Sequence, residues 1–210
     1  MQIKEAYTDW SATYDSDRNL TRDLDQRVAS QILGKLRCRS ILELGCGTGK
    51  NTAMLAEIAE HVRAFDFSRG MIEKAREKVG RSNVTFAMAD ITCPWPVAAE
   101  SMDLIVCDLV LEHVSDLSII FSEAARVLIA GGRFFVCELH PFRQYQGTVA
   151  RFQREETTEI TAFVHHLTDF TDHAVANGFA VKQINEWWHE EDRDKPPRLI
   201  SFLFERSRRA

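Results

Sequence analysis

The chain has 210 residues, of which 45% are hydrophobic, and a formal net charge of −5 at pH 7. This length predicts a single domain over residues 1–210 with a substantial buried core, and the acidic balance argues against a nucleic-acid partner. No stretch approaches the ~20 apolar residues of a membrane span, and the five scattered cysteines suit reduced thiols, so we expect a cytoplasmic protein without a membrane partner.

Residues 1–36 are predicted to form a helical cover over the rest of the chain. Tyr7, Trp10 and Tyr14 are spaced by three and four residues, which places their rings on one helical face. This face either covers the core or forms a lid whose tyrosines contact a ligand. A second helix is expected to begin at Thr21, as its N-cap, and to run to the end of the cover.

A glycine turn follows the next apolar segment. Residues 40–44 have the pattern of a buried strand, and Gly45, Gly47 and Gly49 then lead into a helix. Glycine in such a turn lets a ligand approach the backbone, and the helix N-terminus offers free N–H groups to an anion. The G-x-G-x-G spacing differs from the G-x-G-x-x-G of dinucleotide folds, and an acid, Glu43, lies two residues before the first glycine.

Two further acids follow the next predicted strands. Asp66 comes directly after the second strand, where a carboxylate grips ribose hydroxyls in nucleotide folds; the alternative is an N-cap for the helix of residues 68–79. Asp90, with Ile91 beside it, follows the strand of residues 84–88, and its alternative is an ordinary turn aspartate. Acids at successive strand ends indicate a ligand site at one edge of a sheet.

The fourth predicted strand, residues 103–107, runs into Asp108 and, five residues later, into His113. His113 is either a site residue or a polar residue at the start of a helix. A helix over residues 117–129 and a fifth strand over residues 133–139 continue the alternation of strands and helices that is typical of a parallel sheet.

The glycine turn with its preceding acid, the acids at the following strand ends and the segment MDLIVCDLVLEHV together resemble the class I S-adenosylmethionine-dependent methyltransferases, in their small-molecule, type 11-like branch. The resemblance extends over residues 7–205 and is most specific over residues 41–113. It implies an α/β, Rossmann-like sheet of seven strands, six parallel and one antiparallel, with helices on both faces. It also implies S-adenosylmethionine as cofactor, S-adenosylhomocysteine as its product, and a cofactor-binding core over residues 37–140.

The resemblance assigns the cofactor contacts to the ends of the first four strands. It implies that the glycine turn holds the methionine part, that Asp66 binds the ribose, and that Asp90 with Ile91 binds the adenine. The residues expected to bind the cofactor are Glu43, Gly45, Cys46, Gly47, Gly49, Asp66, Phe67, Asp90, Ile91 and Asp108.

The irregular segment at residues 141–167 lies where this family inserts its acceptor-binding elements, and a short strand is expected near its end, at residues 163–167. The candidate catalytic bases are His140 and His113. The residues expected to contact the substrate are Tyr7, Tyr14, Arg143 and Tyr145, and the arginines of the segment suit an anionic acceptor. Residues 168–210 are predicted to form a closing helix and a β-hairpin.

The expected function is transfer of a methyl group from S-adenosylmethionine to an O or N atom of a small-molecule acceptor by in-line displacement. The alternatives are a non-catalytic cofactor-binding or activator subunit with the same fold, and a nicotinamide dehydrogenase, which the glycine spacing disfavours. No metal is expected, because the histidines and acids near residues 165–166 and 189–192 fit no metal motif. The protein is expected to be a monomer or a homodimer.

Overall fold

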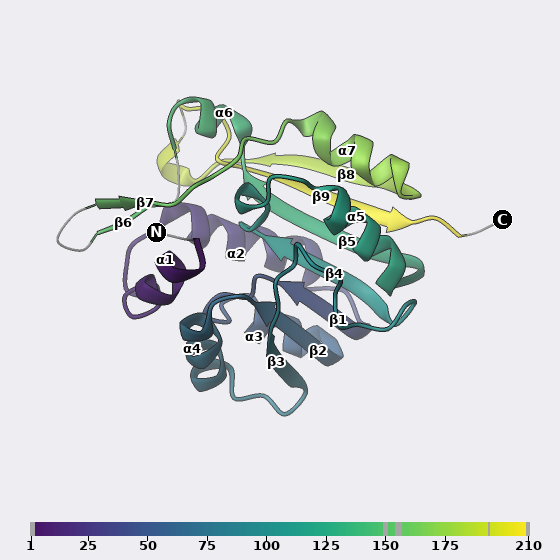
Figure 1. Ribbon diagram of the computed structural model, residues 1–210. Helices are drawn as coiled ribbons and strands as arrows, with labels where there is room; N and C mark the ends of the chain where they lie inside the picture. Colours follow the sequence, from purple (N-terminus) through teal and green to yellow (C-terminus); the bar gives the residue numbers. More distant parts are fainter. Residues whose placement is uncertain (1–2, 149–150, 154–156, 193, 209–210) are drawn as a thin grey trace.

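The computed structural model describes residues 3–148, 151–153, 157–192 and 194–208. The strands of its main sheet are β1 (Cys38–Leu44), β2 (Ala59–Asp66), β3 (Val84–Met88), β4 (Met102–Asp108), β5 (Leu128–Leu139), β8 (Phe179–Trp187) and β9 (Leu199–Arg206). They lie in the order β3-β2-β1-β4-β5-β9-β8, and all neighbours are parallel except β9, which is antiparallel to β5 and β8 (Figure 1). The expected sheet of six parallel strands and one antiparallel strand is therefore confirmed. Two short strands, β6 (Arg151–Gln153) and β7 (Thr157–Glu159), form a separate antiparallel pair.

Helices cover both faces of the main sheet, as expected. Their bounds are α1 (Ile3–Trp10), α2 (Leu20–Leu33), α3 (Thr52–Ile58), α4 (Arg69–Val79), α5 (Ser118–Val127), α6 (Pro141–Tyr145) and α7 (Leu167–Ala176), with short 3-10 turns η1 (Leu111–His113) and η2 (Glu190–Asp192). α2 and α3 pack with Ile41 and Val62 on one face, whereas α5 and α7 pack with Phe134 and Phe204 on the other. Within the described part of the chain, no helix is both long and apolar enough to span a membrane.

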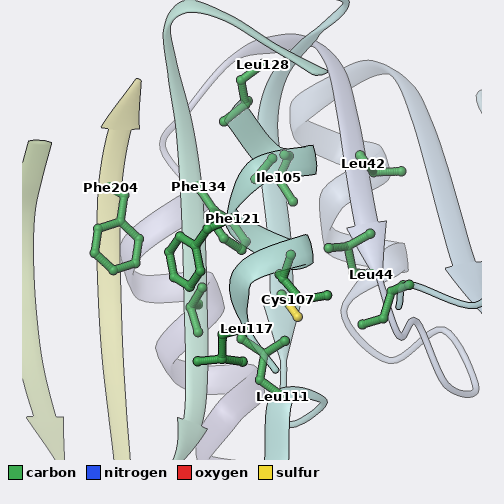
Figure 2. Close-up of a cluster of buried hydrophobic side chains, with 14 of the residues drawn as sticks. Leu42, Leu44, Ile105, Cys107, Leu111, Leu117, Phe121, Leu128, Phe134 and Phe204 are labelled. Carbon is green, nitrogen blue, oxygen red and sulfur yellow. The ribbon is translucent and has the colours of Figure 1, made fainter. Parts of the chain in front are cut away.

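Phe121 of α5 lies at the centre of the larger core. Figure 2 shows Phe121 next to Phe134, and the centroid of its ring lies 5.5 Å from that of Phe134 and 5.6 Å from that of Phe204. Truncation of a buried phenylalanine to alanine costs about 3–5 kcal/mol of folding free energy. This cluster therefore fixes β4 and β5, whose ends carry several of the predicted site residues.

Local hydrogen bonds move some element boundaries from their expected positions. Asn19, rather than Thr21, caps α2, because its side-chain oxygen accepts from two backbone N–H groups of the first turn. β5 begins at Leu128 and not at residue 133, since its pairing with β4 continues through an irregularity to Met102.

The segment after β5 forms α6 and the β6–β7 pair. The strand expected at residues 163–167 is wrong: the backbone there is irregular, and the N–H of Phe163 donates to the carbonyl of Glu112 at 2.6 Å instead of to a neighbouring strand. Just before it, Ile160 is buried against Trp10 of α1. The segment after β5 therefore lies against the N-terminal cover.

The position of β1 between β2 and β4 determines where a ligand can bind. The chain runs from β1 outwards in one direction through β2 and β3, and then in the other direction through β4 and β5. A crevice forms beyond the carboxyl ends of the strands at such a switch point, and it is the usual ligand site of an open α/β sheet.

Candidate functional site

A pocket lies at this switch point, with walls from α1, α2, the glycine turn and the segments that follow β2, β3 and β4. Counted with its open mouth, its space is about 1070 Å³, which is ample for a cofactor or a small molecule. The predicted cofactor residues in its lining are Glu43, Gly45, Cys46, Gly47, Asp66, Phe67, Asp90, Ile91 and Asp108. Tyr7, Tyr14 and His113 also line it.

The glycines of the turn differ in their surroundings. A Cβ at Gly47 would meet no atom within 4 Å, so this residue leaves open space beside the pocket. A Cβ at Gly49, whose φ is +82°, would lie 2.7 Å from Cγ2 of Val79, so this glycine lets the turn pack on α4. Gly49 is outside the pocket lining, and its expected cofactor contact is therefore replaced by a packing role.

Asp66 holds the glycine turn and the start of α4 together. Its Oδ2 accepts a hydrogen bond from the N–H of Gly47 at 2.9 Å, and its Oδ1 accepts one from the N–H of Ser68 at 2.8 Å. Ser68 itself caps α4, because its hydroxyl accepts from the N–H of Met71. The capping role thus falls to Ser68, and the Asp66 carboxyl group stands in the pocket wall, where burial raises its pKa to about 6.

Glu43 lies almost fully buried at the end of β1. Its Oε2 accepts a hydrogen bond from the hydroxyl of Thr52 at 2.5 Å, which ties β1 to the first residue of α3. Burial raises the pKa of Glu43 to about 8. A positively charged group in the pocket would favour the ionised form of this side chain.

Asp90 and Ile91 form the wall beyond β3. Asp90 is exposed, and its Oδ1 accepts from both the N–H and the hydroxyl of Thr92. Ile91 is buried, and its carbonyl accepts the indole N–H of Trp95 at 3.0 Å. Trp95 is buried behind this wall and holds Ile91 in place without lining the pocket.

Two acids from different elements are joined by Asn51. Its Nδ2 donates to Oδ2 of Asp25, on α2, and to Oδ2 of Asp108, at the end of β4, each at 2.9 Å. Asp108 is one of the residues predicted from the sequence, whereas Asp25 and Asn51 are not. A signal for Asp25 was available, because an acid between Leu24 and Val28 on an amphipathic helix is a buried polar residue that needs a partner.

Tyr7 and His113 meet above the end of β4. The Tyr7 hydroxyl lies 2.8 Å from Nε2 of His113, and Nδ1 of His113 lies 2.8 Å from the carbonyl oxygen of Thr161. Because a carbonyl only accepts, Nδ1 carries the proton and Nε2 accepts from Tyr7. Burial lowers the pKa of His113 and raises that of Tyr7, so both side chains are neutral near pH 7.

The cover is attached to the pocket at two further points. The guanidinium of Arg22, which the sequence analysis missed, lies 3.9 Å from the ring centroid of Tyr14 and donates to the carbonyl of Asp17 at 2.9 Å. The hydroxyl of Thr48, in the glycine turn, donates to Oδ1 of Asp15 at 2.7 Å. The N-terminal segment is thus part of the pocket wall and not only a cover of the core.

His140 lies outside the pocket lining, contrary to its expected role as a base. Its side chain is 1% exposed, and its Nδ1 accepts from the N–H of Phe142, as the N-cap of α6. Its Nε2 lies 3.1 Å from Oε1 of Glu186. Both ring nitrogens are therefore engaged in holding α6 to β8, and His113 is the candidate base that remains.

Arg143 and Tyr145 are also outside the pocket lining, contrary to the expectation that they contact the substrate. Arg143 is buried, with NH2 3.1 Å from Oδ1 of Asp192. Tyr145 is exposed, and its hydroxyl lies 2.5 Å from Nδ1 of His166. Among the described residues, no group of three or more His, Cys, Asp and Glu side chains could hold a metal ion.

Residues 42–136 match the family model described as "Methyltransferase domain". A demethylmenaquinone methyltransferase from Tropheryma whipplei is 35% identical over 120 residues, which cover 56% of this chain and 49% of that protein. A phosphoethanolamine N-methyltransferase from Triticum aestivum is 36% identical over 123 residues, which cover 55% of this chain and 24% of that protein. The chain thus spans about half the length, or less, of these curated relatives.

Solved structures resemble the chain over nearly its whole length. A DhpI complex with S-adenosylhomocysteine has a TM-score of 0.77 at 22% identity and covers 99% of this chain and 96% of its own. The N-methyltransferase NodS from Bradyrhizobium japonicum WM9, in complex with S-adenosylhomocysteine, has a TM-score of 0.75 at 17% identity and covers 99% of this chain and 100% of its own. At these identities the likeness shows a shared fold.

Proposed function

We propose that the protein transfers a methyl group from S-adenosylmethionine to an O or N atom of a small-molecule acceptor, and the match of residues 42–136 to the methyltransferase family model supports this proposal. The observation that carries the proposal is the glycine turn beside Asp66. The turn leaves open space at Gly47, and the carboxyl group of Asp66 stands next to it in the pocket wall.

The chemistry of the pocket wall fits the parts of this cofactor. Open space at Gly47 admits the methionine part close to the backbone. The carboxylate of Asp66 can accept from both hydroxyls of a ribose, while Asp90 and Ile91 offer an acceptor and an apolar surface to the adenine. The acids Glu43 and Asp108 provide negative charge for a cationic ligand. When bound, S-adenosylmethionine supplies a methyl group that is already strongly electrophilic.

The remaining task of the chain is to position the acceptor and to take up its proton. Tyr7 and His113 are proposed to do this as a pair. As the acceptor atom loses its proton to the oxygen of Tyr7, the hydroxyl proton of Tyr7 moves to Nε2 of His113. The carbonyl of Thr161 keeps the other ring proton in place, so His113 presents its free nitrogen to Tyr7 in every cycle.

The pocket lining supports an acceptor without an anionic group close to its reacting atom. Arg22 and Lys50 are the only arginine and lysine among the described lining residues. Lys50 is paired with Asp23, and Arg22 donates to backbone carbonyls of the cover. With Arg143 outside the pocket, the expected anionic acceptor loses its support.

A coupled assay that measures S-adenosylhomocysteine formation tests the proposal. The protein would be incubated with S-adenosylmethionine and a panel of small phenols, amines and carboxylic acids, with Asp66→Ala as the control that lacks the ribose contact. We expect product with at least one phenol or amine, and little product from the control. Tight cofactor binding without product from any acceptor would indicate a binding module instead. Preferential binding of NADH would contradict the cofactor assignment.

A further inference from the structure

The acid pair Asp25 and Asp108 has unusual hydrogen bonding. A single amide group, that of Asn51, donates one hydrogen to each carboxyl group. The second oxygens, Oδ1 of Asp25 and Oδ1 of Asp108, are buried and have no hydrogen-bond partner, and the same is true of Oδ1 of Asn51. Buried carboxylate oxygens are rarely left unpaired, because an unsatisfied acceptor costs about 1–3 kcal/mol and more when it is charged.

The surroundings do not neutralise the pair. The titratable and charged groups around it are Tyr14 of the cover, Arg22 on α2, Glu43 on β1, Lys50 beside Asn51, Asp66 on β2, Cys107 on β4, and Cys137 and Glu138 on β5. Both cations are engaged elsewhere, Lys50 with Asp23 and Arg22 with backbone carbonyls. The other groups are carboxylic acids, thiols and the Tyr14 phenol, none of which supplies positive charge, so the local field opposes a second negative charge.

Two carboxyl groups that share one donor and have buried second oxygens cannot both ionise at low cost. Burial raises the pKa of Asp25 to about 6 and that of Asp108 well above its ordinary value, with the Asp25 charge as a further cause for Asp108. A proton held by the pair would also satisfy the unpaired oxygens, because a protonated carboxyl group donates a hydrogen bond.

We propose that Asp25 and Asp108, joined by Asn51, form a proton-holding pair in the pocket wall that releases its proton when a sulfonium-bearing cofactor binds. The released proton passes to solvent, and the positive charge of the bound cofactor takes its place beside the two carboxyl groups. The pair therefore makes binding specific for a positively charged cofactor. This inference rests on the proposed function. S-adenosylhomocysteine lacks the sulfonium charge, so the pair retains more of its proton with the product than with the substrate.

Isothermal calorimetry in two buffers of different ionisation enthalpy measures the protons released per bound ligand. The titrations would use S-adenosylmethionine and S-adenosylhomocysteine at pH 6, where the Asp25 carboxyl group is close to its pKa. We expect the parent to release close to one proton with S-adenosylmethionine, and fewer with S-adenosylhomocysteine. In Asp25→Asn, which keeps an oxygen for Asn51, the release with S-adenosylmethionine should fall to roughly half or less. In Asp25→Asn/Asp108→Asn it should fall further, to the share that Glu43 and Asp66 contribute.

Asp116→Asn is the control outside the pocket lining. Asp116 is exposed, and the hydrogen bonds from Ser118 lower its pKa, so it carries no proton at pH 6 and its change should leave the released number as in the parent. Equal release from the parent and the double variant would overturn the proposal and would assign the proton to another wall acid, such as Glu43. Absence of S-adenosylmethionine binding to the parent would instead contradict the proposed function. Circular dichroism of each variant verifies that it is folded.

Discussion

The hydroxyl of Tyr7 and Nε2 of His113 lie 2.8 Å apart, although 106 residues separate them in the chain. Their rings meet edge to face, with centroids 5.4 Å apart at an angle of 71°. Tyr7 comes from the N-terminal cover and His113 from the turn after β4, so the pair exists only when the cover is seated on the sheet. This contact joins the N-terminal cover to the turn after β4, and an acceptor would have to enter the pocket between these two parts.

Removal of either member of this pair should slow methyl transfer without weakening the binding of the product. A general base typically contributes about 10²–10⁴-fold to a rate, so we expect losses in kcat of that order for Tyr7→Phe and His113→Gln. Tyr145→Phe is the control, because that hydroxyl is exposed and outside the pocket lining. Steady-state kinetics measure the rate of methyl transfer, and S-adenosylhomocysteine titrations measure the affinity for the product. An unchanged kcat in both variants would exclude the pair from the mechanism.

Asp66→Ala should strongly reduce the affinity of the protein for the cofactor. Charge-assisted hydrogen bonds contribute about 1.5–3 kcal/mol each, so the loss of one to the ribose weakens affinity about tenfold or more. The same change frees the N–H groups of Gly47 and Ser68, which loosens the turn and adds to the loss. Calorimetric titration measures the effect, and parent-like affinity in a folded variant would show that Asp66 does not bind the ribose.

Gly47 and Gly49 should respond differently to the same substitution. Valine at position 47 would enter open space, so we expect loss of cofactor binding with a moderate fall in stability from the positive φ. Valine at position 49 would meet Val79 at 2.7 Å or less, so we expect a larger fall in the melting temperature. Thermal melts of the two free variants compare their stability, and cofactor titrations of each folded variant compare their affinity. Equal melting temperatures would show that the turn does not pack on α4 as described.

Arg143→Ala should reduce stability and leave the kinetics of the folded protein unchanged. Its guanidinium is buried 3.1 Å from Oδ1 of Asp192, which also accepts from Arg198. Removing one partner of a buried ion pair costs up to about 3–5 kcal/mol in the free energy of unfolding, and Arg198, which still pairs with Asp192 in the variant, reduces this cost. Urea denaturation measures this cost. A rise in KM for the acceptor without a loss of stability would return Arg143 to the substrate site.

The free protein should become less stable as the pH rises from about 5 to 8. Burial raises the pKa of Glu43 and of Glu138 to about 8, against an ordinary value of 4.5, so the folded state holds protons that the unfolded state has lost. The stability from these groups is complete below pH 4.5 and is lost progressively as the pH rises to about 8, with a slope of up to about 1.4 kcal/mol per pH unit for each proton. Melting temperatures across this range should fall, and Glu43→Gln should flatten the decline; an equal slope in the variant would exclude Glu43 as a source.

Local patterns in the sequence were sufficient for the fold and for most of the pocket wall. Strands, helices and the glycine turn are set by the spacing of apolar residues and glycines, which is visible along the chain. Asp66 and Asp90 could be placed at one edge because the carboxyl ends of parallel strands meet there. The predicted sheet, and the place of these acids in the pocket lining, followed from that rule.

The direction of individual side chains was decided by the tertiary structure. His140 directly follows a strand, as Asp108 ends one, yet its ring is buried against Phe142 and Glu186 while Asp108 lines the pocket. Asp25 lies on a helix that local patterns predict as a simple cover, and it reaches Asp108 only through Asn51. The physical reason is that spacing along the chain fixes which residues share a face, whereas packing between distant elements determines what that face meets.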